Sequence, residues 1–219
     1  MSEARARVLD ALQDDLERIY AVRAPMRASD FAIDRGELLS HRGAERAPEE
    51  LLVRHNAGGL EVGLYVSDEV VARLASPGPW TAARLAAHCA AAEGVSHFVY
   101  LTLRADADRQ VSQLELEAQA EVDKYATVLF SLWERGNREA SGELRSALFE
   151  SVRYREHLAG AERERYRLAN FLAATYTRLL ELRYVARGAF EAMLRELRRL
   201  WRLGAGEKLS HLARPLALG

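Results

Sequence analysis

The segment Glu93–Trp133, EGVSHFVYLTLRADADRQVSQLELEAQAEVDKYATVLFSLW, contains the longest regular hydrophobic pattern in the chain. In its second half, residues 111–133, apolar side chains recur every three or four positions, the spacing of one face of an α-helix. A polar segment, residues 104–109, separates this half from the first. If both halves are helical, they run antiparallel about that turn. The sequence therefore predicts a helical hairpin at the centre of the fold.

The first half of this segment allows a second interpretation. Residues 95–103 are rich in side chains that favour strands, so a strand is the alternative to a helix there. The helix is favoured because a stripe with helical spacing runs through the region: Leu85, Cys89, Ala92, Ser96, Val99 and Leu103.

Helical patterns occupy most of the remaining chain. They cover residues 3–22, 67–75, 138–158, 162–185 and 189–203. The pattern over 162–185 nearly encircles the helix, which predicts a central and well-covered element: Tyr166, Leu168, Phe171, Leu172, Tyr176, Leu179, Leu180 and Leu182.

The best strand signal is Leu51–Val66, in which apolar residues alternate with others after a turn at residues 56–59. This pattern predicts a β-hairpin with one apolar face. Two strands alone are marginally stable, so this face must pack on helices or the sheet must gain a third strand. Residues 31–33 are a further candidate strand.

Together these elements predict a mainly α protein of the α+β class. We expect an antiparallel helical bundle with an N-terminal helix and a small β-hairpin packed against it. The break at residues 76–79 divides an N-terminal subdomain, 1–78, from a helical bundle, 79–204. Residues 205–219 are expected to form a weakly ordered tail, and the two parts to share one core.

Composition narrows the class of protein. The 219 residues are 49% hydrophobic and 29% charged, as in a globular chain. The net charge of -1 gives no overall attraction to nucleic acid or anionic lipid. The start has no apolar core of a signal peptide, and no run is long enough to span a bilayer, so a cytoplasmic location is expected. A single cysteine, Cys89, excludes an intramolecular disulfide, and we expect it to be a buried, unreactive thiol.

One group of residues points to metal chemistry. Glu93 and His97 are four apart in the first helix of the hairpin, and Glu117 and Glu121 are four apart at a matching level of the second. Carboxylates and imidazole between antiparallel helices are ligands for iron or manganese. This arrangement predicts a metal site and, as an alternative function, a metal-dependent enzyme. The paired Glu-x-x-His motifs of di-iron bundles are absent.

Two simpler interpretations use the same region. The acids are expected to form a solvated edge with ion pairs to Arg104, Arg109 or Lys124. Alternatively, a half-buried hydrogen-bond network fixes the register of the two helices, with four members: His97, Tyr100, Glu121 and Tyr125.

A basic face lies on the helix 189–203. Its four arginines fall within ~100° of arc, opposite the apolar side: Arg195, Arg198, Arg199 and Arg202. The simplest interpretation is a solvated or internally paired face. The alternatives are a site for a protein partner, or an anion-binding site for nucleic acid or lipid.

No phosphate-binding loop, nucleophile elbow or zinc-binding spacing is present in the sequence. The sequence therefore favours a non-catalytic cytoplasmic interaction or regulatory protein that needs no cofactor. We expect it to bind a protein partner or to self-associate as a homo-oligomer through an apolar helix face. The metal-dependent enzyme and nucleic-acid binding through the arginine face are the alternatives.

Overall fold

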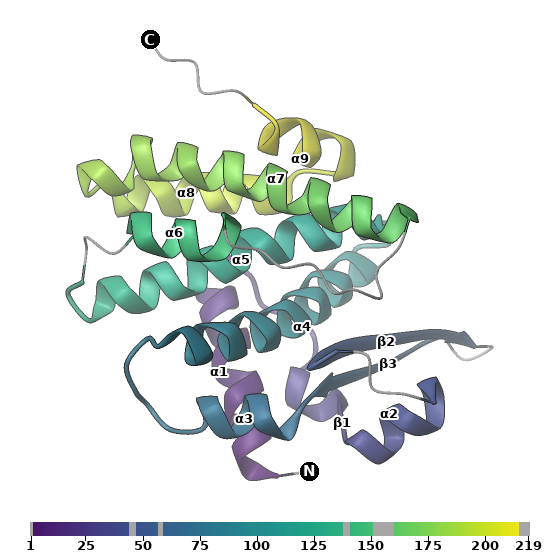
Figure 1. Cartoon of the computed structure of the whole chain (residues 1–219). Coiled ribbons are helices and arrows are strands. Elements are labelled where there is room, and N and C mark those ends of the chain that lie inside the picture. The colour runs from purple at the N-terminus through teal and green to yellow at the C-terminus, as the bar shows by residue number, and fades with distance from the viewer. Residues whose placement is uncertain (1, 44–46, 57–58, 138–140, 151–159, 215–219) are drawn as a thin grey trace. The chain divides into compact units, whose positions relative to one another are not determined.

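The computed structural model describes residues 2–43, 47–56, 59–137, 141–150 and 160–214 (Figure 1). In these ranges the chain forms nine α-helices and one small three-stranded sheet, which confirms the predicted mainly α, α+β class. The chain divides into two compact units. The first unit contains Met1–Glu17 and Val22–Gln110, and the second contains Arg18–Ala21 and Val111–Gly219. The predicted break at residues 76–79 falls inside the first unit.

The first unit contains the sheet and the helices that precede and follow it in the sequence. Its elements are α1 (Glu3–Tyr20, whose last turn belongs to the second unit), η1 (Ala28–Phe31), β1 (Ala32–Ile33), α2 (Arg35–Arg42), β2 (Glu49–Asn56), β3 (Gly59–Val66), α3 (Asp68–Leu74) and α4 (Ala82–Asp106).

The predicted hairpin is confirmed and gains a third strand. β2 pairs antiparallel with β3, and β1 pairs parallel with the other edge of β3, so the strand order is β1-β3-β2. Residues 57–58 of the predicted turn lie outside the described residues. The sheet packs against α4, where Gly94 allows close approach: a Cβ atom there would lie 2.9 Å from Leu64 Cδ1.

Helix α4 continues without a break through residues 95–103, so the helical interpretation of this segment is confirmed. Side-chain caps begin several helices where the sequence places Ser or Thr. The hydroxyl of Thr81 accepts a hydrogen bond from the Arg84 amide at 3.2 Å, and Ser112 does the same for Glu115 at 3.2 Å. The cap at Ser112 sets the start of α5 two residues after residue 111, where the apolar pattern placed it.

Two helices differ from the prediction. Residues 35–42, which show no sustained hydrophobic period, form α2 because Asp34 and Glu37 make a capping box at its start. Residues 205–212, predicted to be a weakly ordered tail, form α9 (Ala205–Leu212), in which Lys208, His211 and Leu212 are buried. Residues 215–219 lie outside the described residues.

The second unit is a group of helices around α5. Its elements are α5 (Gln113–Glu134), α6 (Ser141–Phe149), α7 (Gly160–Arg183), η2 (Val185–Arg187), α8 (Phe190–Arg202) and α9. Helix α5 contacts α6, α7 and α9 and is buried on nearly every side. The rest of the predicted helix 138–158, from residue 151 onwards, lies outside the described residues.

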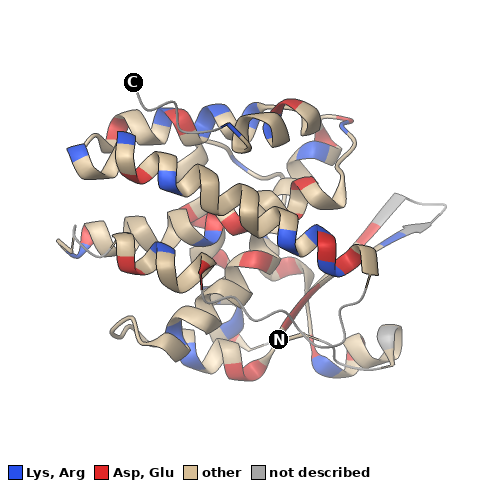
Figure 2. Ribbon diagram, turned by 45° about the horizontal axis from the view of Figure 1, so that its top comes forward, with Lys and Arg blue, Asp and Glu red and all other residues tan. Residues whose placement is uncertain are grey.

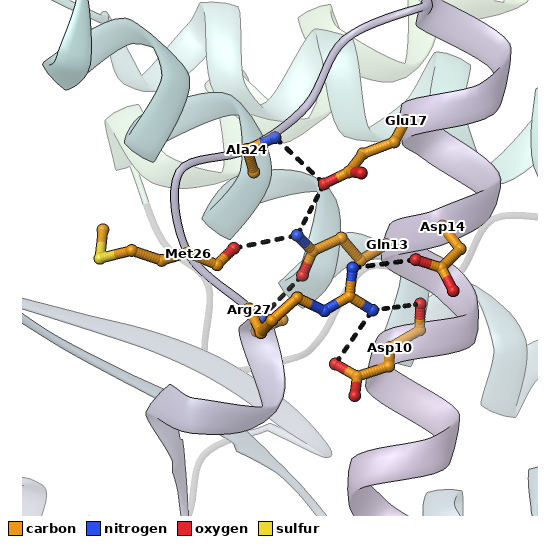
Figure 3. A network of polar contacts seen from close by, with 8 residues as sticks. Asp10, Gln13, Asp14, Glu17, Ala24, Met26 and Arg27 are labelled. Atoms are coloured by element: carbon orange, nitrogen blue, oxygen red, sulfur yellow. Dashed lines mark hydrogen bonds and ion pairs between the residues drawn. The ribbon is translucent and has the colours of Figure 1, made fainter.

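The loop that follows α1 is held to that helix by side-chain hydrogen bonds (Figure 3). The buried amide of Gln13 donates to the Met26 carbonyl at 2.9 Å and accepts from the Ala28 amide at 2.7 Å. Arg27 donates to the Asp14 carboxylate at 2.9 Å. Since Gln13 satisfies two backbone groups of the loop, it determines the path of the chain from α1 towards β1.

We expect Gln13→Ala to lower the free energy of unfolding by about 1–3 kcal/mol, because it leaves the buried Ala28 amide and Met26 carbonyl without their partner. Urea denaturation followed by circular dichroism measures this. Gln110→Ala, at an exposed position, is the control and should change stability by less than ~0.5 kcal/mol. Equal stability of the two variants would contradict the role assigned to Gln13.

No helix of the described residues combines the length and the apolar character that crossing a membrane requires.

Candidate functional site

The two predicted metal ligands of the first unit lie one turn apart on α4. Glu93 and His97 are both half-buried. A third acid, which the sequence analysis did not identify, lies near this part of α4: buried Glu49 of β2 has its Oε2 atom 3.7 Å from the Cβ position of Gly94. The sequence pattern could not identify Glu49, because it precedes the apolar run of β2 and no helical spacing relates it to His97. Carboxylate and imidazole groups of this kind are possible ligands for a metal ion.

The other two predicted ligands lie on α5 in the second unit. Buried Glu117 has the guanidinium of Arg165 3.9 Å away, and Glu121 accepts a hydrogen bond from Lys124 at 2.9 Å. The ion pair of Glu121 with Lys124 is one of those expected for a solvated edge, but Glu117 and Lys124 are buried, so this region is not the solvated edge that was predicted. The four predicted ligands thus belong to two different units, and their convergence on one metal ion stays a prediction.

The predicted polar network is likewise divided between the units. On α4, the Tyr100 hydroxyl accepts a hydrogen bond from Arg104 at 2.6 Å. On α5, Tyr125 is buried near the ion pair that Arg145 and Glu181 make at 2.9 Å. Burial and the Glu181 carboxylate raise the pKa of Tyr125 far above its usual range, so this phenol stays neutral. A single network that joins His97 and Tyr100 to Glu121 and Tyr125 stays a prediction.

Cys89 is less deeply buried than predicted, and its unreactive character stays a prediction. Cys89 is half-buried on α4. The imidazole of its neighbour His88 makes an edge contact with the Trp80 ring, at 5.0 Å between centroids. Burial and the nearby Arg84 guanidinium lower the pKa of His88 to about 4. His88 is therefore a neutral, packed side chain at neutral pH.

The His88 environment predicts a loss of stability in mild acid. The unfolded chain binds a proton at this imidazole near pH 6.5, whereas the folded chain binds it only near pH 4. Since the unfolded state binds more protons between these values, the free energy of unfolding falls as the pH falls through them. Between pH 7 and 5 the loss from this group is about 2 kcal/mol.

This prediction is checked by urea denaturation at pH 7 and pH 5. His88→Phe keeps an aromatic ring against Trp80 and should lose about 2 kcal/mol less than the wild type over this interval. His41→Phe, at an exposed position of α2, should follow the wild type. Parallel pH dependences for all three proteins would show that His88 does not titrate in the expected way.

The second unit contains a buried polar network that the sequence analysis did not identify. Its four side chains are fully buried: Tyr20, Gln119, Asp123 and Lys208. The Lys208 ammonium donates to Gln119 Oε1 at 2.6 Å, and Gln119 Nε2 donates to Asp123 Oδ1 at 2.7 Å. The Tyr20 hydroxyl also donates to Asp123 Oδ1. This network joins the end of α1, the middle of α5 and α9.

Aromatic and ionic contacts complete the surroundings of this network. The ring of Trp201 on α8 stacks on Tyr20, at 4.2 Å between centroids, and the Lys208 ammonium lies 5.7 Å from the Trp201 ring centre. One turn further along α9, His211 Nε2 lies 2.5 Å from the Glu196 carboxylate of α8. Two polar contacts therefore hold α9 against α5 and α8. Neither lysine nor histidine contributes to a hydrophobic period, so the sequence pattern of 205–212 does not predict the helix.

We expect Lys208→Met to lower the free energy of unfolding by about 1–3 kcal/mol, because it leaves the buried Gln119 carbonyl without its donor. Tryptophan fluorescence during urea denaturation reports this, since Trp201 lies beside the ammonium. The control is Glu207→Ala, at the exposed neighbouring position, which should have little effect. Unchanged stability of Lys208→Met would mean that the network does not stabilise the unit.

The surface of α7 differs from the prediction of a fully covered helix. One side is buried in the second unit through Ala169, Leu172, Ala173, Tyr176, Leu179 and Leu180. A neighbouring edge, about 110° from the centre of the buried side, exposes three large apolar side chains: Leu168 (42% exposed), Phe171 (64%) and Leu182 (47%). At ~100° per residue these three lie within about 60° of arc. We call them the apolar stripe of α7.

The arginine face of α8 is divided by the structure. Arg195, Arg199 and Arg202 are exposed, opposite the buried Met193 and Leu197. Arg198 instead donates hydrogen bonds to the main-chain carbonyls of Ile19 at 3.0 Å and Arg18 at 3.3 Å. Its guanidinium thus satisfies the carboxyl end of α1, as cations near helix C-termini commonly do.

Comparison with known proteins finds no family model, no curated protein and no solved structure that matches this chain.

Proposed function

We propose that this protein is a non-catalytic cytoplasmic interaction protein that self-associates through the apolar stripe of α7. The observation that supports this proposal is the exposure of Leu168, Phe171 and Leu182 on one edge of a single helix. Single exposed apolar residues are common on proteins, but three that share one edge of a helix are typical of an interaction surface. The row extends about 21 Å along the helix axis.

The partner that suits this stripe is a second copy of the chain. Leu168 and Leu182 are equally distant in sequence from Thr175, which lies on the same edge of the helix. In an antiparallel pair of α7 helices related by a two-fold axis at Thr175, each Leu168 is level with the Leu182 of the other copy. The small side chain of Thr175 allows close approach at the centre.

The expected strength of this association is modest. Each of the three side chains is already about half covered, so burying them in both copies contributes on the order of 6–9 kcal/mol. Association itself costs on the order of 4–15 kcal/mol. The difference is at most about 5 kcal/mol, so we expect a weak, reversible dimer with a dissociation constant of about 0.2 mM or above.

The test is sedimentation velocity of the whole chain from about 20 µM to about 1 mM protein. We expect the wild type to shift from monomer towards dimer with concentration, and Phe171→Asp to remain monomeric because a desolvated carboxylate opposes burial. Met26→Asp introduces the same charge at an exposed apolar position of the first unit and should associate like the wild type. Circular dichroism checks that both variants are folded.

Two outcomes would contradict the proposal. A wild type that stays entirely monomeric at about 1 mM would show that the stripe is not a self-association surface. Association of Phe171→Asp as strong as that of the wild type would place any dimer contact elsewhere.

A further inference from the structure

The exposed arginines of α8 form a cationic surface whose charge is not balanced by ion pairs among the described residues. Arg195, Arg199 and Arg202 follow one another at spacings of four and three residues, so they project from one side of the helix. Within the ranges that the structure describes, none of the three takes part in an ion pair. In Figure 2, Lys and Arg positions recur in blue along the helices nearest the C-terminus. Of the simplest interpretation, a solvated or internally paired face, only the solvated form fits these three residues.

A further arginine and an aromatic ring adjoin this surface. Arg183 is exposed at the end of α7, and Tyr184 follows it with a half-buried side chain. Burial and then Glu196 raise the pKa of Tyr184, while the charges of Arg183, Arg199 and Arg195 lower it, so these three guanidinium groups act on the phenol. The Tyr184 main-chain carbonyl accepts a hydrogen bond from the Ala189 amide at 2.9 Å, so this residue adjoins the start of the helix that carries Arg195 and Arg199.

The acidic residues nearby leave this surface cationic. Glu196, the acid that acts on Tyr184, lies 2.5 Å from His211 on the inner side of α8. Glu191 is the exposed acidic residue of α8, one turn before Arg195. Four exposed arginines against one exposed acid give a local positive charge on a chain whose net charge is -1.

We propose that the surface of Arg183, Tyr184, Arg195, Arg199 and Arg202 binds single-stranded nucleic acid. Guanidinium groups bind phosphate oxygens with two parallel hydrogen bonds, and they stay charged at any physiological pH. Arg195, Arg199 and Arg202 extend over about 10 Å along the helix, a length that suits successive phosphates of one strand. A tyrosine among such arginines offers a face on which an unpaired base stacks.

The tyrosine distinguishes this partner from an acidic protein. Carboxylates of a protein would pair with the same arginines but would gain nothing from stacking on Tyr184. Since stacking requires unpaired bases, single strands should also bind more tightly than a duplex of equal length.

The first experiment measures fluorescence anisotropy of labelled 20-nucleotide oligo(dT) and oligo(U) with the whole chain, from 50 to 200 mM NaCl. We expect binding that weakens with salt. R195Q/R199Q/R202Q should reduce the slope of log K against log salt by about 2, since each phosphate contact on a single strand contributes about 0.7. The matched control, R7Q/R23Q/R109Q, removes three exposed arginines of the first unit and should keep the wild-type slope.

The second experiment tests the aromatic ring. Tyr184→Leu should weaken oligonucleotide binding roughly 5- to 100-fold, the range found for loss of one stacked base, and leave binding to poly-glutamate unchanged. Circular dichroism confirms the fold of each variant.

Three results would overturn the proposal. One is the absence of any anisotropy change at 50 µM protein in 50 mM NaCl. Another is an equal loss of binding in R195Q/R199Q/R202Q and R7Q/R23Q/R109Q, which would show attraction to charge in general. The third is unchanged oligonucleotide binding by Tyr184→Leu, which would assign the surface to an acidic protein or another polyanion.

Discussion

The second unit depends on the pairing of polar side chains in the interior around α5. Gln119 and Asp123 are fully buried there, and an unpaired amide or carboxylate at such a position would cost several kcal/mol. Lys208 and Tyr20 supply the missing partners from parts of the chain that lie far away in sequence. The helices that carry these partners must therefore lie where their side chains reach α5. Specific packing in this unit thus follows from hydrogen-bond geometry as much as from apolar contact.

This requirement explains the positions of the C-terminal helices. Helix α9 is short and only weakly hydrophobic, so apolar burial alone would hold it poorly. Its lysine reaches Gln119, its histidine reaches Glu196, and Trp201 of the preceding helix packs on Tyr20. Once α8 is held in this way, its charged side faces outwards. The cationic surface of α8 is thus a consequence of the same interior contacts that anchor α9.

The two proposed surfaces, both of the second unit, differ in physical character. The apolar stripe of α7 gains free energy by leaving water, and its weak expected affinity makes association depend on protein concentration. The arginine surface acts through charge and is weakened by salt. A protein with both can respond separately to its own concentration and to a polyanionic ligand.

Local patterns determined most of the elements of this chain. The period of the apolar residues located α1, α4, α5, α7 and α8, and alternation located the β2–β3 hairpin, because neighbouring residues decide which side of an element can be buried. Caps such as Thr81 and Ser112 lie within one turn of the amides that they satisfy, so these helix starts depend on local sequence as well. The basic side of α8 could be identified because residues three and four positions apart lie on the same side of a helix.

Only the tertiary structure decided which distant residues meet and which sides remain exposed. Nothing local relates Lys208 to Gln119 or Tyr20 to Asp123, because their contacts join residues about 90 and 100 positions apart. The apolar residues of α7 appeared to encircle the helix, yet neighbouring helices cover only one side and leave Phe171 exposed. Periodicity describes the faces of one helix, whereas the number and placement of its neighbours determine which faces are covered. The interior network and the candidate surfaces therefore became visible only once the chain was folded.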